Sequence, residues 1–492
     1  MYLGIDLGTS GVKVVLVDDD QLVVDQASAP LEVSRPFPLW SEQDPADWWR
    51  ATGLAMSALK SRRERELSIV RGIGLSGQMH GATLLDAADR VLRPAILWND
   101  GRSGAECAEL ERRAPDSRRI TGNLAMPGFT APKLLWVARH EPEIFAATAK
   151  VLLPKDYLRL RMTGAYASEM SDSAGTLWLD VGARRWSDTM LAATDLAPGT
   201  MPELFEGSRS TGTLRPEVAA EWGVPAGAVV AGGAGDNAAG AAGVGVVTPG
   251  AAFVSLGTSG VMFVANAGFA PNPEQAVHAF CHCLPDTWHQ MSVILSAAAC
   301  LSWAAGLLGG ADEAALLAEA EAADRDTGRL LFLPYLSGER TPHNDPTAMG
   351  VFYGLGHETG RADLVRAVLE GVAFAFADGQ RALAAAGSEI GATSVIGGGA
   401  RSAFWGRIMA AVLDRPLTYH KGGEVGPAYG AARLGRLAAT DEDPAAICTR
   451  PPVDHVIEPD ASMVARYAEK WAAYRALYPA LAPRFAADAG QG

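Results

Sequence analysis

The apolar residues at the start of the chain come in short runs separated by glycine-rich or acidic turns. The segment 2–27 contains three such runs, rich in β-branched side chains: YLGIDLGTSGVKVVLVDDDQLVVDQA. Runs of this length between turn residues predict strands. We therefore expect strand, turn, strand, turn and strand at this end of the chain.

Later segments alternate between helical and strand patterns. The apolar spacing of residues 45–66 and 361–387 predicts two helices. Residues 69–81 predict a strand that enters a turn, and residues 393–414 predict a strand, three glycines and a helix. Such alternation is typical of α/β domains.

The string LGTSGV occurs twice, at residues 7–12 and 256–261, each time between two strand-like runs. Repetition half a chain apart indicates duplicated halves that each contribute a β-hairpin; chance recurrence of a common turn is the alternative. Glycines at a hairpin tip let successive N–H groups converge on an anion. Because a strand pattern, VKVVLV, follows the first turn, neither a dinucleotide-binding motif nor a P-loop fits, since both continue into a helix.

The composition narrows the class of protein. The 492 residues are 48% hydrophobic and 20% charged, as in a globular protein of two domains. The net charge of −14 argues against nucleic-acid binding. Five irregularly spaced cysteines favour a reducing compartment. With no secretory signal visible, and glycines and Pro249 interrupting the uncharged stretch after Asp236, we expect a cytoplasmic protein without a membrane partner.

Two aspartates adjoin the predicted glycine-rich turns. Asp6 precedes the first hairpin turn, and Ser255 is the equivalent residue before the second turn. A carboxylate beside phosphates can hold Mg²⁺, and capping of the turn is the alternative. Asp236 follows the glycines of AGGAGD and could accept the proton of an attacking hydroxyl in phosphoryl transfer; capping of the next helix is its alternative.

Other polar and glycine-rich motifs suit small ligands. His80 in SGQMHG and Asp100 in LWNDGR lie on predicted loops, where donors and acceptors could bind a polyhydroxylated substrate. The glycines 397–399 at a helix start suit either contact with a nucleotide or close packing. The cluster HAFCHC at 278–283 lacks the spacing of a structural zinc site, and its alternation fits a strand.

Together these motifs resemble the FGGY carbohydrate kinases over nearly the whole chain. GIDLGTSGVK and SLGTSG resemble the family's two phosphate hairpins, GFTAPKLLWVARH and GVFYGLGHETGRADLVRAVLE its two signature regions, and IGGGARS its adenosine-site loop. The resemblance implies an α/β fold of the two-domain actin-like ATPase (ribonuclease H-like) type. Its duplicated halves would be residues 1–245 and 246–492, with the ATP cleft between them.

The resemblance also implies roles for individual residues. Asp236 would be the general base, and Asp6 would act on Mg²⁺ and the phosphates. Met79, His80 and Asn237 would contact the sugar. ATP would be bound by Thr9, Ser10, Gly11, Thr258, Gly398, Gly399 and Ala400.

Within the family, several stretches resemble the members that phosphorylate D-xylulose on its 5-hydroxyl: GQMHG, LWNDGR, TGNLAMPGFTAPKLLW, LLPKDYLRLRMTG and YLSGERTPHND. A glycerol kinase would be expected to carry Arg-Glu in place of Met79 and His80. We therefore expect an ATP- and Mg²⁺-dependent kinase of D-xylose catabolism. A related kinase of ribulose, gluconate or a polyol is the nearer alternative, and a non-metabolic actin-like ATPase the more distant one. Family analogy also suggests a homodimer.

Overall fold

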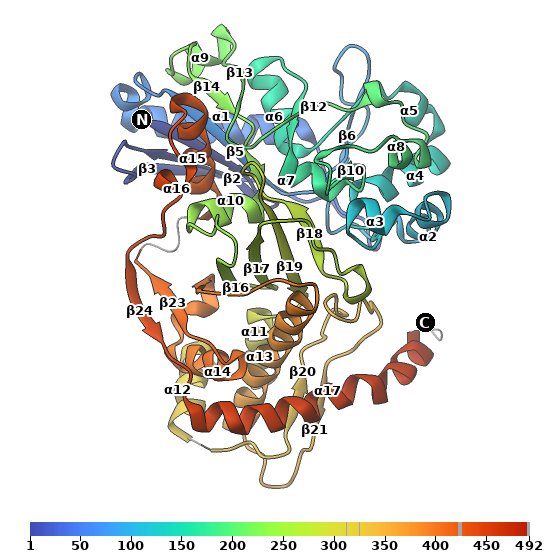
Figure 1. Cartoon of the computed structure of the whole chain (residues 1–492), viewed down its shortest axis with the longest axis vertical. Coiled ribbons are helices and arrows are strands. Elements are labelled where there is room, and N and C mark those ends of the chain that lie inside the picture. Colours follow the sequence, from blue (N-terminus) through green and yellow to red (C-terminus); the bar gives the residue numbers. More distant parts are fainter. Residues whose placement is uncertain (311, 324, 422–425, 490–492) are drawn as a thin grey trace.

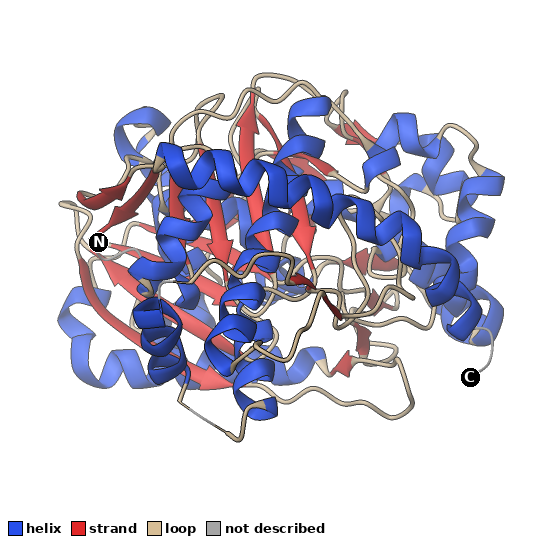
Figure 2. Ribbon diagram, turned by 90° about the horizontal axis from the view of Figure 1, so that it is seen from below, coloured by secondary structure: helices blue, strands red, loops and turns tan. Residues whose placement is uncertain are grey.

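The computed structural model describes residues 1–310, 312–323, 325–421 and 426–489. Two mixed sheets occupy the upper and lower halves of the molecule (Figure 1), and helices flank the strands (Figure 2). Every described helix lacks the length or the apolar character needed to cross a membrane.

The first sheet has the strand order β13-β14-β5-β1-β2-β3, with β15 also paired to β5. β1, β2 and β3 are antiparallel neighbours, whereas β5 runs parallel to β1, and β14 parallel to β5. The strands span Tyr2–Leu7 (β1), Gly11–Val17 (β2), Val23–Pro30 (β3), Gly72–Gly77 (β5), Ser210–Thr213 (β13), Val229–Ala231 (β14) and Ala234–Gly235 (β15).

The second sheet has the order β18-β19-β17-β16-β22-β23-β24. Five of its strands, β19-β17-β16-β22-β23, repeat the order and directions of β3-β2-β1-β5-β14. This match confirms the predicted duplication. The strands span Ala252–Leu256 (β16), Gly260–Asn266 (β17), His278–Cys281 (β18), Trp288–Ile294 (β19), Thr393–Ile396 (β22), Leu417–His420 (β23) and Val453–Ile457 (β24).

The helices predicted at 45–66 and 361–387 are present as α1 (Pro45–Leu67) and α13 (Arg361–Ala385). The Asp44 side chain accepts a hydrogen bond from the Ala46 N–H at 2.9 Å and so caps α1. The predicted helix after the three glycines is α14 (Ala403–Leu413), preceded by a 3₁₀ turn, η4 (Gly398–Arg401).

The remaining elements complete the two halves. The other helices are α2 (Gly104–Arg113), α3 (Ser117–Thr121), α4 (Thr130–His140), α5 (Pro142–Ala147), α6 (Pro154–Thr163), α7 (Met170–Ser173), α8 (Asp188–Ala193), α9 (Pro216–Trp222), α10 (Asp236–Gly243), α11 (Ala298–Leu307), α12 (Glu313–Ala323), α15 (Gly426–Thr440), α16 (Pro444–Ile447) and α17 (Ala461–Ala489). Short strands are β4 (Glu42–Gln43), β6 (Thr83–Leu85), β7 (Ala95–Ile96), β8 (Lys150–Leu152), β9 (Ala167–Glu169), β10 (Leu179–Asp180), β11 (Arg185–Trp186), β12 (Glu203–Phe205), β20 (Leu331–Leu333) and β21 (Val351–Tyr353).

Helix α15 follows the second sheet in sequence but packs on the first sheet (Figure 1). Glycines make this contact possible, because a Cβ on Gly74 of β5 would lie 1.7 Å from the Ala431 carbonyl oxygen of α15. A Cβ on Gly430 of α15 would likewise lie 1.8 Å from the Ala239 carbonyl oxygen of α10. Backbone-to-backbone contacts therefore join α10, the helix that begins with Asp236, to α15 and α15 to the first sheet.

Candidate functional site

Asp6 and Asp236 lie at the ends of strands on either side of β5. Asp6 of β1 pairs with Ser76 of β5, and Ala234 of β15 pairs with Ser76 from the other side. Asp236 comes two residues after Ala234 and is the first residue of α10. Because neighbouring strands lie about 4.8 Å apart, the two carboxyl groups approach the same end of β5.

Both carboxyl groups are harder to ionise than an ordinary aspartate. Burial raises the pKa of Asp6 to about 6, and the nearby Asp236 raises it too, against the lowering effects of Ser76 and Lys13. Burial also raises the pKa of Asp236 to about 6, against hydrogen bonds from Asn237. Among the described residues, Asp6 Oδ1 is buried without a hydrogen-bond partner. An unpaired carboxylate oxygen beside a second carboxylate suits a bound cation.

The Asp236 side chain is held by the residue that follows it. Its Oδ1 accepts hydrogen bonds from the Asn237 backbone N–H at 2.7 Å and from Asn237 Nδ2 at 2.9 Å. Since both bonds fall on Oδ1, Oδ2 is the oxygen better placed to take up a proton. A carboxylate with a pKa near 6 is both ionised at neutral pH and basic enough for that role.

The first predicted phosphate turn is tied to residues beyond the hairpin. The Gly8 N–H donates to the Gly11 carbonyl at 3.0 Å and closes the turn. Thr9 Oγ1 donates to Gln78 Oε1 at 3.0 Å and accepts from Trp98 Nε1 at 2.9 Å. These bonds fix the turn that carries Thr9, Ser10 and Gly11 relative to the end of β5.

The second turn and the last two glycines of the triplet line a common cleft of about 840 Å³, a size suited to a nucleotide. Thr258, Gly398 and Gly399 are among the residues that line it. A Cβ on Gly399 would lie 2.5 Å from Leu256 Cγ, whereas one on Gly398 would meet no atom within 4 Å among the described residues. Gly399 is therefore required for packing, and Gly398 leaves open space. The backbone of Ala400 belongs to η4, but its side chain lies outside what the structure describes.

The predicted sugar residue His80 lines a separate small cavity of about 40 Å³. The other residues of its wall are Trp98, Met126, Gly128, Phe129, His278 and Arg340. Met79 lies next to the backbone that precedes Asp236, since a Cβ on Gly235 would lie 3.0 Å from Met79 Sδ. Met79 therefore contacts the backbone that leads to Asp236, and the residue after it, His80, lines the cavity.

His80 is neutral and fixed in one tautomer. Burial, with a contribution from the nearby Lys133, lowers its pKa to about 3. Its Nδ1 lies 2.6 Å from the Gly175 carbonyl oxygen, so Nδ1 carries the proton and Nε2 is left as an acceptor for a substrate hydroxyl. The backbone of His80 has φ 69°, and Lys133 Nζ donates to its carbonyl at 2.9 Å. A strained backbone at a ligand pocket is a recognised feature of binding sites.

His278 and Arg340 bring the second half of the chain to this cavity. Arg340 Nη1 lies 3.3 Å from His278 Nε2, and His278 Nδ1 lies 3.3 Å from Asn123 Oδ1. Burial lowers the pKa of His278 well below its ordinary value, so Nε2 accepts from the guanidinium and Nδ1 donates to Asn123. The strand predicted for 278–283 is present over His278–Cys281, but that pattern did not mark His278 as a pocket residue. Arg340 lies in the motif YLSGERTPHND, and nothing in the neighbouring sequence indicates that it lines this cavity.

Asp100 is buried and is not among the residues that line this cavity. Its Oδ2 accepts from the Ser41 N–H at 2.6 Å and from Arg102 Nη2 at 2.7 Å, and its Oδ1 accepts from Arg102 Nε at 2.9 Å. These bonds fix the loop that presents Trp98. A contact between Asp100 and the sugar stays a prediction.

Comparison with known protein families assigns the class. The model of the N-terminal domain of the FGGY family of carbohydrate kinases matches residues 1–243, and that of the C-terminal domain matches residues 252–439. The chain belongs to the FGGY family of carbohydrate kinases, as its motifs predict. Kinases of this family use ATP and act on small sugars.

The curated relatives and solved structures include several xylulose kinases. The chain is 57% identical to the xylulose kinase of Escherichia coli K12 over 487 residues, covering 99% of this chain and 100% of that one. It is 56% identical to that of Klebsiella pneumoniae, covering 98% and 99%. The crystal structure of a "xyloylose kinase" from Brucella ovis has a TM-score of 0.96 at 57% identity, covering 98% and 99%. These neighbours confirm the predicted fold class.

Proposed function

We propose that this protein transfers the γ-phosphoryl group of ATP to the 5-hydroxyl of D-xylulose, giving D-xylulose 5-phosphate and ADP in D-xylose catabolism. The observation that carries the proposal is the 57% identity to a xylulose kinase over 487 residues. The Met79-His80 pair beside the Asp236 backbone supports it, because a neutral histidine acceptor suits a sugar hydroxyl.

Asp236 acts as the general base. Above about pH 6 its carboxylate is mostly ionised, and Oδ2 accepts the proton of the 5-hydroxyl as that oxygen forms a bond to the γ-phosphorus. The bond from the γ-phosphorus to the β–γ bridging oxygen breaks, and ADP leaves with that oxygen. The turns with Thr9, Ser10, Gly11 and Thr258 offer N–H groups to the phosphates, and Gly398, Gly399 and Ala400 contact the adenosine.

Asp6 fits a site for Mg²⁺. Its buried Oδ1, which has no hydrogen-bond partner among the described residues, is a hard oxygen ligand, and Asp236 lies near enough to raise the pKa of Asp6. Mg²⁺ bound there would neutralise charge on the ATP phosphates. Within the described ranges no group of three or more His, Cys, Asp or Glu side chains is arranged to hold a metal ion, so phosphate oxygens and water would complete the coordination.

The chain is divided into two domains, residues 1–245 and 246–492, and the sugar is bound between them. His80 comes from the first domain, while His278 and Arg340 come from the second; Met79, Asn237 and Asp100 are the other proposed contacts. The cavity of about 40 Å³ has room for a few water molecules rather than a pentose. Sugar binding therefore requires the domains to move apart, and their closure excludes water from the reaction.

A coupled ADP-release assay tests the proposal. D-xylulose should be turned over far faster than ribulose, gluconate or glycerol; faster turnover of gluconate or ribulose would contradict the substrate assignment. Sugar-independent ATP hydrolysis as fast as the sugar-stimulated rate would instead favour an actin-like ATPase. Asp236→Asn should lower kcat by about 10²- to 10⁴-fold with KM for ATP unchanged, and near-normal turnover would reduce Asp236 to a helix cap.

We also propose a cytoplasmic homodimer, on the family resemblance alone. Light scattering during size-exclusion chromatography should give twice the mass of one chain. The mass of a single chain would contradict the dimer.

A further inference from the structure

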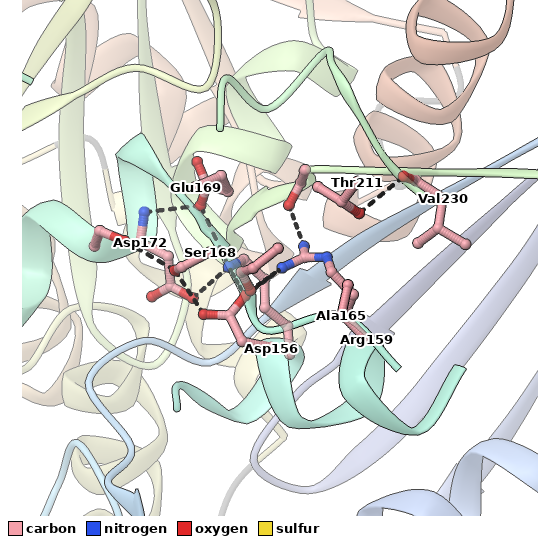
Figure 3. Close-up of polar contacts among 12 residues, drawn as sticks. Asp156, Arg159, Ala165, Ser168, Glu169, Asp172, Thr211 and Val230 are labelled. Atoms are coloured by element: carbon pink, nitrogen blue, oxygen red, sulfur yellow. Dashed lines mark hydrogen bonds and ion pairs between the residues drawn. The ribbon is translucent and has the colours of Figure 1, made fainter. Parts of the chain in front are cut away.

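Five charged side chains lie buried next to the backbone that leads to Asp236. Figure 3 labels four of them, Asp156, Arg159, Glu169 and Asp172. Lys155, Asp156 and Arg159 come from α6, Glu169 from β9 and Asp172 from α7, and each is 0% exposed. Burying charges costs free energy even when they are paired. None of these groups takes part in the proposed reaction, so another role is needed to explain them.

The cluster is internally paired. Lys155 Nζ lies 2.8 Å from Asp156 Oδ1, 3.0 Å from Asp172 Oδ2 and 3.5 Å from Glu169 Oε1, and Arg159 Nη1 lies 2.7 Å from Asp156 Oδ1. Burial raises the pKa of Asp172 to about 8, and the neighbouring carboxylates add to this against the lowering effect of Lys155. Three carboxyl groups thus share two cations, and burial opposes the ionisation of Asp172.

Two hydrogen-bond paths connect the cluster to the backbone of residues 232–235. The Arg159 guanidinium donates to the Gly232 carbonyl and, at 2.7 Å, to the Ala167 carbonyl. On the second path the Gly235 N–H donates to Ser171 Oγ at 3.1 Å. Ser171 Oγ in turn donates to Glu169 Oε1 at 3.0 Å. The cluster therefore holds the backbone at both ends of the segment that delivers Asp236.

The position of the Asp236 carboxylate depends on this backbone. Among the described residues it accepts hydrogen bonds from Asn237, the next residue, so the pair moves with the chain that carries it. Even a small displacement of a catalytic group lowers the reaction rate strongly. We propose that Ser171, held by Glu169 and the charges behind it, is a positioning residue that orients Asp236 for proton transfer; this rests on the proposed role of Asp236 as the base.

Two serines that donate hydrogen bonds to carboxylates of the cluster make a matched pair for the test. Ser168 is 1% exposed, as Ser171 is, and its Oγ donates to Asp156 Oδ2 at 2.6 Å and lies 2.8 Å from Ser173 Oγ, not against residues 232–235. Ser171→Ala should lower kcat about tenfold and leave KM for sugar and ATP within about twofold. Ser168→Ala should leave all three within about twofold, although both variants lose one buried hydroxyl and should unfold at similar temperatures.

The pH profile of kcat/KM separates a positioning role from a purely structural one, because a loss of stability alone does not shift this profile. A loosened Asp236 is better hydrated, so its pKa should fall from about 6 toward the ordinary value. The acidic limb of kcat/KM should then move to lower pH in Ser171→Ala and stay in place in Ser168→Ala. If Ser171→Ala does not fold, Glu169→Gln, which weakens the acceptor of the Ser171 hydroxyl, should show the same split between kcat and KM.

The outcomes separate this role from the base itself. Full turnover by Asp236→Asn would overturn the base assignment whatever the serine variants do. An inactive Asp236→Asn together with equal kcat values for the two serine variants, or an unmoved acidic limb in Ser171→Ala, would overturn only the positioning role.

Discussion

Replacing Asp6 with asparagine should make the protein more stable while it weakens the use of Mg²⁺. Burial, with the nearby Asp236, raises the pKa of Asp6 from 3.8 to about 6. Each unit of such a shift corresponds to about 1.4 kcal/mol, so keeping Asp6 ionised in the folded protein costs up to about 3 kcal/mol at neutral pH. Asparagine has nearly the same size and no charge.

The net gain should be smaller than that limit. The variant also loses the favourable effects of Ser76 and Lys13 on the carboxylate. We expect a gain of about 1–2 kcal/mol, which for a chain of 492 residues is a rise of roughly 1–2 °C in the unfolding midpoint.

The pH dependence of the unfolding midpoint shows whether the charge of Asp6 causes the difference in stability. Between pH 3.8 and about 6 the folded wild type binds more protons at Asp6 than the unfolded chain does, so its stability falls as pH rises through this window and then levels off. The variant lacks this dependence. The difference in midpoint should therefore be small at pH 4.5 and complete at pH 7.5.

Scanning calorimetry at both pH values is the measurement. Asp20→Asn is the matched control, because Asp20 is an exposed aspartate on the turn between β2 and β3, and its midpoint should follow the wild type at both pH values. A less stable Asp6→Asn variant at pH 7.5, or a difference that does not grow from pH 4.5 to 7.5, would refute the reasoning.

Four further results are expected. Asp6→Ala should raise the Mg²⁺ concentration needed for half-maximal activity, and an unchanged titration would count against its metal role. Gly398→Ala should raise KM for ATP about tenfold without moving the unfolding midpoint, since its methyl group enters open space in the cleft. Gly74→Ala should lower the midpoint sharply or prevent folding, because its Cβ would lie 1.7 Å from a carbonyl oxygen of α15, whereas Gly240→Ala, with nothing within 4 Å among the described residues, should not. Because the pKa of His80 is lowered to about 3, its titration should cause no inflection in the KM for sugar between pH 5 and 8. An inflection in this range that disappears in His80→Ala would contradict a neutral His80.

The parts of the fold that are local in sequence were predictable. The strands around both LGTSGV turns follow from short β-branched runs between turn residues, and α1 and α13 follow from long apolar periodicity. The duplication was predictable because the same six letters occur in the same strand context twice. In each case, the residues that decide the structure are neighbours in the chain.

Contacts between distant segments could not be predicted in the same way. Gly4, Gly72 and Gly74 are glycines inside strands, a sign of close backbone approach, but nothing in the sequence indicates that α15 is what approaches. Arg340 and His278 lie far along the chain from His80, and only the fold brings them to one cavity. Asp100 has the chemistry of a sugar ligand, and only the structure shows its oxygens bonded to Ser41 and Arg102.

The packing of α15 on the first sheet affects folding during synthesis. The strands of that sheet are complete once residue 235 has left the ribosome, yet the helix that covers their glycine-lined face ends at Thr440. About two hundred further residues must be translated before this apolar surface can be sealed. The nascent chain therefore exposes this apolar sheet face until most of the second half has been synthesised, and a chain in that state is prone to aggregation.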